Sequence, residues 1–131
     1  MKGSLLTARS VLDAWMDGIN HGRTDEVLAL YAPDAILLPT FSSRTVLNEE
    51  GRRRYFEQLI SREDLSVTLH EKTVHIQTSG LLEVISGIYC FRFSIDDEVL
   101  SFEARFSYVV DLSLQDPILH HHSSQVPRQL S

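Results

Sequence analysis

The chain has 131 residues, of which 43% are hydrophobic, and its formal net charge is −6 at pH 7. This length suits a single domain, residues 1–131, that buries roughly two-thirds of its unfolded surface. The acidic balance argues against nucleic acid and anionic membrane surfaces as partners.

The sequence also restricts where the protein is expected to work. It contains no run of about 18 apolar residues, so no membrane-spanning helix is expected. Residues 1–7 lack the apolar core and cleavage pattern of a signal peptide. The single cysteine, Cys90, excludes an internal disulfide and suits a reducing compartment. We therefore expect a cytoplasmic protein.

Helices are predicted in the first half of the chain. Residues 5–21 repeat apolar side chains at spacings of three and four, which is typical of an amphipathic helix, and Gly22 is a natural stop. Thr24 can cap a second, shorter helix that carries Tyr31 and ends before Pro33.

A short strand and a third helix follow. Residues 35–39 form an apolar strand, and residues 40–47 have the composition of a loop. Asn48 can cap a helix that runs to about Ser61. The apolar face of this helix comprises Tyr55, Phe56, Leu59 and Ile60.

From Leu65 onward, β-branched and aromatic residues dominate. Ser79-Gly80 and Asp96-Asp97 supply two turns, and residues 115–117 supply the last. Helices first and a meander of long strands afterwards predict an α+β domain, with helices on one face of an antiparallel sheet. The predicted strands cover residues 66–78, 81–95, 99–112 and 117–124.

The two central strands differ in pattern. Residues 101–111 alternate apolar and polar side chains, and Arg105 lies on the polar face, which favours a core side and a water side. Residues 81–95 are apolar on both faces, which indicates a sheet covered on both sides. Helices can cover one side, and a second copy of the sheet is the simplest cover for the other. The Arg105 face would then line an internal pocket.

Three further features carry possible chemistry. Arg52, Arg53 and Arg54 lie on the third helix, either as a solvated basic turn or directed at a carboxylate or phosphate. By helical angle, Arg52 lies near the centre of the apolar face and Arg53 on its flank. Cys90 is expected to be an inert core thiol. Arg92 lies on the same strand face, and a nearby cation favours a reactive thiolate, so a nucleophilic role for Cys90 is the alternative.

Consecutive histidines, 120–122, lie in the last predicted strand. Strand alternation places His120, His122 and Ser124 on one face, and His121 and Ser123 on the other. His122 is either a hydrogen-bonded buried histidine or a ligand contact. A metal site with His70 and His75 would need three or four ligands with supporting contacts, so no metal is expected.

These segments together resemble the nuclear transport factor 2-like superfamily, and more narrowly the association domain of calcium/calmodulin-dependent protein kinase II with its free-standing bacterial relatives, which are SnoaL-like. The resemblance covers residues 8–128. Its motifs are the first helix with Trp15 and Asn20-His21-Gly22, residues 31–40, residues 53–59, Gly87-Ile88-Tyr89, Glu103-Ala104-Arg105-Phe106, and residues 120–127.

The resemblance implies a cone-shaped curved antiparallel sheet wrapped around the N-terminal helix, a cystatin-like fold. It implies a pocket with arginines, which match Arg53 and Arg105, and places His122 on the pocket side of the last strand. Arg52 replaces Arg53 if the helix register differs by one. The other pocket residues are Trp15, Tyr31 and Tyr55.

Two departures from the family pattern affect this pocket. Asp116-Pro117 stands where the family carries an aromatic residue, which indicates a reshaped start of the last strand. Cys90 stands where the kinase domain has a third arginine, with Arg92 two residues on.

Two functions follow from the resemblance. The first is a domain without catalytic activity that forms a homodimer through the sheet, or a larger ring, and binds a small anionic or organic ligand. The second is an isomerase, cyclase or hydrolase of the ketosteroid-isomerase or SnoaL type that uses His122 as general acid or base, with Tyr31, Tyr55 or Glu103 as its partner. Neither function requires a cofactor.

Overall fold

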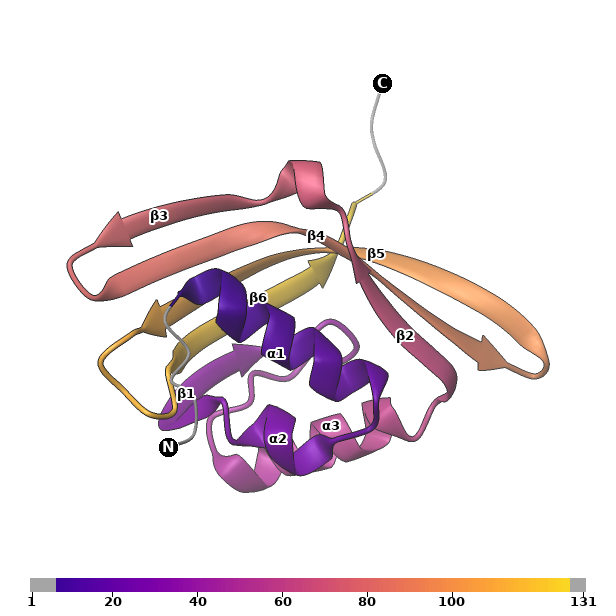
Figure 1. The fold of residues 1–131 in the computed structure, drawn as a ribbon. Helices are drawn as coiled ribbons and strands as arrows, with labels where there is room; N and C mark the ends of the chain where they lie inside the picture. Colours follow the sequence, from indigo (N-terminus) through magenta and orange to yellow (C-terminus); the bar gives the residue numbers. More distant parts are fainter. Residues whose placement is uncertain (1–6, 128–131) are drawn as a thin grey trace.

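The computed structural model describes residues 7–127. The first half of the chain supplies the helices and the second half supplies long strands (Figure 1). The elements are α1 (Ala8–Asn20), α2 (Thr24–Leu28), β1 (Tyr31–Leu38), α3 (Glu49–Ile60), β2 (Glu63–Leu69), a 3-10 turn (Glu71–Thr73), β3 (His75–Ser79), β4 (Leu82–Ile95), β5 (Glu98–Asp111) and β6 (Ile118–Gln125).

The strands form one curved sheet in the order β1-β6-β5-β4-β2, and β3 also pairs with β4. β4 is long enough to pair with β3 along its first half and with β2 along its second half. All pairings are antiparallel except that of β1 with β6, which is parallel. The α+β class with an N-terminal helix against a curved, unclosed sheet is confirmed, and the sheet is mixed at one edge.

The helix boundaries agree with local signals. Thr7 caps α1 through the backbone N–H of Ser10, and Asn48 caps α3 through that of Gly51. The predicted helix 5–21 therefore becomes Ala8–Asn20, with residues 5 and 6 outside the described chain. None of the described helices is long and apolar enough to cross a membrane.

Two predicted elements are wrong in detail. Tyr31 begins β1 instead of ending the second helix, since Leu30 and Tyr31 reach the edge of the sheet, where the Leu30 carbonyl accepts from Ile118 N–H at 2.9 Å. The single strand predicted over residues 66–78 is two strands, because the 3-10 turn steps the chain from one half of β4 to the other.

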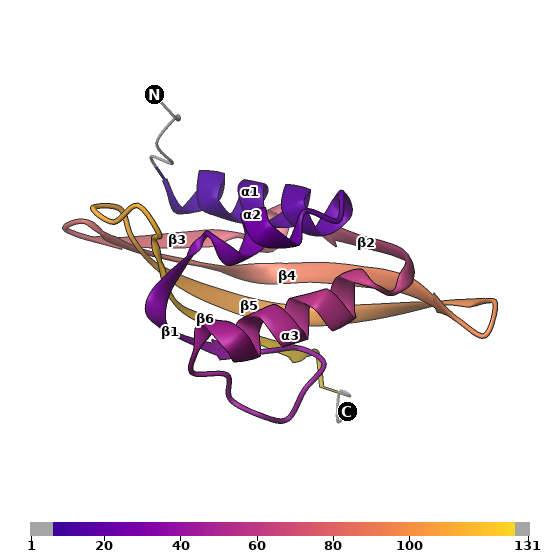
Figure 2. The ribbon, with the colours of Figure 1, turned by 90° about the horizontal axis from the view of Figure 1, so that it is seen from below.

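All three helices lie on one side of the sheet, which we call the inner face, and no described helix covers the opposite side, the outer face (Figures 1 and 2). Alternation along β4 and β5 assigns side chains to the two faces. Inner-face residues such as Tyr89, Phe91 and Tyr108 are at most 1% exposed. Outer-face residues such as Ile88 and Val109 are half-buried.

Candidate functional site

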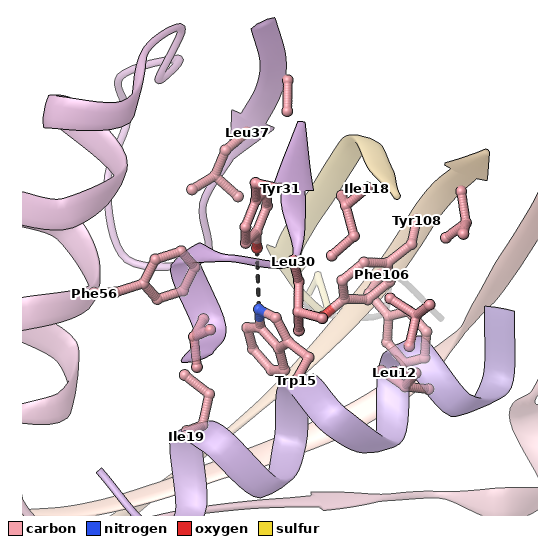
Figure 3. Close-up of a cluster of buried hydrophobic side chains, with 14 of the residues drawn as sticks. Leu12, Trp15, Ile19, Leu30, Tyr31, Leu37, Phe56, Phe106, Tyr108 and Ile118 are labelled. Carbon is pink, nitrogen blue, oxygen red and sulfur yellow. Dashed lines mark hydrogen bonds between the residues drawn. The ribbon is translucent and has the colours of Figure 1, made fainter. Parts of the chain in front are cut away.

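The interior of the curved sheet is filled by aromatic side chains around Trp15 of α1. The Trp15 indole stacks on Tyr89 with ring centroids 5.6 Å apart and an interplanar angle of 12°. Phe56 of α3 and Tyr108 of β5 meet the same indole edge-on, and Figure 3 shows them closing around it. Since these side chains are 0–1% exposed, this part of the interior is packed core.

Hydrogen bonds join polar groups of α1, β1, β4 and β6 inside this core. Trp15 Nε1 donates to the Tyr31 hydroxyl at 3.0 Å (Figure 3), and that hydroxyl lies 2.7 Å from His121 Nδ1. On the other edge of the imidazole, Nε2 lies 3.1 Å from the Tyr89 hydroxyl, which donates to Ser123 Oγ at 2.8 Å. We call these five residues the buried hydrogen-bond network.

The directions in this network follow from the Tyr89 hydroxyl, which donates to Ser123 Oγ and therefore accepts from His121 Nε2. The Tyr31 oxygen accepts from Trp15, and its own proton is donated to His121 Nδ1. The neutral imidazole thus carries its proton on Nε2, where it donates to Tyr89, and accepts at Nδ1 from Tyr31. At the far end, Ser123 is hydrogen-bonded to Thr40 Oγ1, and both residues border a surface hollow of about 280 Å³.

The His121 imidazole is held neutral by its surroundings. Its side chain is 2% exposed and stacks on the Tyr108 ring with centroids 3.8 Å apart. Burial lowers the pKa of His121 well below its usual value, and the adjacent His120 and His122 lower it further. Burial raises the pKa of the tyrosines packed around the ring: Tyr31, Tyr89 and Tyr108.

We expect the His121 imidazole to stay neutral in the folded protein below pH 6.5, because burial holds its folded-state pKa well below the unfolded value of about 6.5. The unfolded state then binds the proton first, so this group lowers stability progressively as the pH falls from about 6.5 to its folded-state pKa, and it has no effect on stability well above pH 6.5. An NMR titration of the ring protons checks this, with the urea-unfolded protein as control. A folded-state midpoint near 6.5 for His121 would contradict it.

A β-bulge explains why His121, and not His122, points inward. Neighbouring residues of β5 pair with Ile118 and His120, so Leu119 has no cross-strand partner. One extra residue reverses the alternation beyond it. Ile118 and His121 are therefore both buried, and His122 is exposed on the outer face. The expectation that His122 lies inside the cone is corrected accordingly.

Arg52 is the inward arginine of α3, and its guanidinium is bound to main chain. β1 is irregular before Ile36, where the pairing register with β6 shifts. The Arg52 guanidinium donates to the carbonyls of Ala35 at 3.0 Å, Ala32 at 3.2 Å and Pro33 at 3.2 Å. Its side chain is 2% exposed, and burial lowers its pKa. Arg52 therefore holds the irregular part of β1 in place.

Arg53 lies on the exterior of α3, contrary to the pocket position expected for it. Its guanidinium pairs with Asp25 of α2 at 3.0 Å and with Glu57 at 3.7 Å. Its side chain is 44% exposed. The one-residue rotation along the helix thus turns Arg53 to solvent and Arg52 to the core.

Arg105 and His122 do lie together, but on the outer face. The strand register puts Ser107 opposite His122, and Ser124 opposite Arg105. With His75 of β3, these side chains border a hollow of about 590 Å³, which we call the outer hollow. The six predicted site residues are thus divided between the core (Trp15, Tyr31), the mouth of the cone (Tyr55), the outer hollow (Arg105, His122) and the exterior of α3 (Arg53).

Cys90 and the remaining histidines form no ligand set. Cys90 is half-buried on the outer face opposite Glu103, and not in the core. The His70 imidazole lies 3.2 Å from the Glu103 carboxylate. Within residues 7–127, no group of three His, Cys, Asp or Glu side chains is placed to hold a metal ion.

A third hollow, which we call the mouth hollow, lies between α3 and the loop 41–48. Its volume is about 540 Å³, and Tyr55, Phe93, Asn48 and Gln58 contribute to its lining. The arginines on its wall are Arg44, Arg54 and Arg62. No sequence motif marks this set, because Arg44 lies in the loop before α3, Arg54 lies on α3, and Arg62 lies just beyond its end. The helix spacing of Arg54, Gln58 and Arg62 was the available signal.

Comparison with known proteins agrees with this fold. A model of the calcium/calmodulin dependent protein kinase II association domain matches residues 8–127. No curated protein sequence matches the chain.

Solved structures share the architecture. A Xanthomonas campestris protein named for this association domain is 25% identical, with a TM-score of 0.82 over 92% of this chain and 86% of that one. Two more distant ones share the fold alone. A nuclear transport factor 2-like protein of Novosphingobium aromaticivorans with a cystatin-like fold is 7% identical, with a TM-score of 0.75 over 92% of this chain and 80% of that one. A ketosteroid isomerase-like protein of Erwinia carotovora atroseptica is 13% identical, with a TM-score of 0.72 over 98% of this chain and 100% of that one. With its family model matched from α1 to the end of β6, the chain belongs to the calcium/calmodulin dependent protein kinase II association domain family.

Proposed function

We propose that this protein is a self-associating domain that forms a homodimer through the outer face of its sheet and binds a small anionic or organic ligand. The single observation that carries the proposal is the bare outer face (Figures 1 and 2). A second copy of the chain is the proposed cover, in keeping with the association-domain family to which the chain belongs.

The chemistry of the outer face fits a second sheet. Val84, Ile88 and Val109 place apolar groups on neighbouring strands, and Ile36 of β1 is 38% exposed at the edge. The floor of the outer hollow is made of small residues that include Ser86, Gly87 and Ser107. Small residues let another sheet approach closely, and an isologous contact would repeat the same face on both partners. Arg105 and His122 would then be enclosed between the two copies.

A variant on the outer face tests the proposed dimer. We expect Ile88→Glu to give a monomer, because a carboxylate at the centre of the proposed contact would be buried without a partner. Leu114→Glu is the matched control, since Leu114 is 43% exposed in the loop before β6. Light scattering should give a dimer or larger mass for the unmodified chain and for Leu114→Glu only. Equal masses for all three proteins would overturn the proposal.

The enzyme alternative finds less support in the geometry. A general acid or base needs hydrogen-bond reach to a substrate. His122 lies on the outer face, and both ring nitrogens of His121 are already hydrogen-bonded within the core. A substrate of His121 would have to displace Tyr31 or Tyr89. We therefore place self-association before catalysis.

A further inference from the structure

The mouth hollow concentrates positive charge in an acidic protein. Three arginines line it, and the residues that border it include no aspartate or glutamate. The chain as a whole carries a formal net charge of −6, so this local excess runs against the overall balance. A cavity of about 540 Å³ is within the usual range for small-molecule sites.

The arginines of this hollow retain capacity for a ligand. Within residues 7–127, no carboxylate lies within 4.0 Å of the Arg44 guanidinium or the Arg62 guanidinium. Arg62 lies over the Phe93 ring at 5.3 Å, which fixes its position without neutralising its charge. Arg54 meets Glu50 at 3.5 Å in an exposed pair, where water and salt weaken the attraction.

The loop that carries Arg44 is anchored on both sides. Before it, the Phe41 ring packs edge-on against Phe91, Phe93 and Phe102 of the sheet, and Phe41 N–H donates to the Tyr55 hydroxyl at 3.3 Å. After it, Val46 exchanges two backbone hydrogen bonds with Leu37, and Asn48 caps α3. A hollow held in this way is largely preformed, so less ordering free energy is lost on binding.

The walls of the hollow are chemically divided. The arginine forks match the two oxygens of a carboxylate. The polar side chains of Asn48 and Gln58 add hydrogen-bonding groups, and the Tyr55 hydroxyl, with a pKa raised by burial to about 12, stays protonated. Apolar contact comes from Phe41, Val46, Leu47, Leu59 and Phe93.

We propose that the mouth hollow binds a small organic acid, with its carboxylate on Arg44 and Arg62 and its apolar body against Phe41 and Phe93. This site deepens the ligand-binding part of the proposed function, and it is separate from the outer face used for self-association. The mass of the protein in solution is therefore expected to be the same with and without the ligand.

Benzoate and its neutral isostere benzamide are suitable probes. In an NMR titration at low ionic strength, we expect benzoate to shift the amide signals of residues 41–48 and 54–62. We expect benzamide to bind with at least about tenfold lower affinity, because one charge-assisted hydrogen bond changes the dissociation constant about tenfold. Equal affinities of the two probes in this titration would overturn the proposal. Binding of inorganic phosphate without benzoate would also overturn it, because it would assign the arginines to a different ligand.

Variants separate this site from the rest of the molecule. Arg44→Gln and Arg62→Gln are each expected to weaken benzoate binding about tenfold. Arg53→Gln is the matched control, because Arg53 lies on the same helix as Arg54 but faces Asp25 and not the hollow. Benzoate affinity that survives in Arg44→Gln/Arg62→Gln would contradict the assignment. If the unmodified protein binds benzoate but is a monomer in solution, only the self-association proposal is overturned.

Discussion

Arg52→Ala is expected to lower the free energy of unfolding by about 3–5 kcal/mol, or the melting temperature by about 10–20 °C. The physical reason is the loss of three hydrogen bonds from a buried guanidinium to the carbonyls of Ala32, Pro33 and Ala35. These oxygens lie in the irregular part of β1, where the pairing register with β6 shifts. Urea denaturation at neutral pH measures the effect.

Arg53→Ala is the matched control for this prediction. Arg53 follows directly in the sequence and has the same side chain, but it is exposed and pairs with Asp25 and Glu57 at the surface. Its removal is expected to leave the urea midpoint almost unchanged. A large loss for Arg53→Ala with a small loss for Arg52→Ala would mean that α3 is rotated by one residue, and the assignment of its inner face would fail.

His121→Leu is expected to cost about 2–5 kcal/mol of unfolding free energy, since it leaves the hydroxyls of Tyr31 and Tyr89 buried without their shared partner. Leucine restores most of the volume, so the loss reports the hydrogen bonds more than a cavity. Thermal and urea denaturation at pH 7.5, where the imidazole is neutral in both states, measure it.

His122→Leu separates the two neighbouring histidines. His122 lies on the outer face and, within residues 7–127, is hydrogen-bonded to no buried hydroxyl of the core, so the same substitution is expected to cost clearly less stability than His121→Leu. If His122→Leu proved as costly as His121→Leu, the bulge at Leu119 would be absent and the faces of β6 would be reversed.

The elements that the sequence predicted well are those with strong local signals. The apolar spacing of the first helix follows from its packing on the inner face, and Asn48 marks the start of α3. Asp96 and Asp97 form the turn between β4 and β5 with φ values of 51° and 65°, a conformation that aspartate tolerates. The parallel pairing of β1 with β6 depends on contacts between segments that lie far apart in the sequence, so it has no local signal.

The candidate site was harder to predict, because a shift of one residue in a strand or helix decides whether a side chain points to the core or to the exterior. Alternation alone placed His121 and Ser123 on one face of the last strand, but the bulge at Leu119 decides that this face is the inner one. Helical angle favoured Arg52 as the inward arginine, whereas the family resemblance favoured Arg53. The mouth hollow required the position of the loop 41–48 over α3, which only the folded chain reveals.

Sedimentation equilibrium of the unmodified protein is the decisive measurement for self-association. We expect a mass of twice 14.9 kDa, or a larger whole multiple of a dimer, that persists on dilution through the micromolar range. A single species of 14.9 kDa at every concentration up to the solubility limit would contradict it.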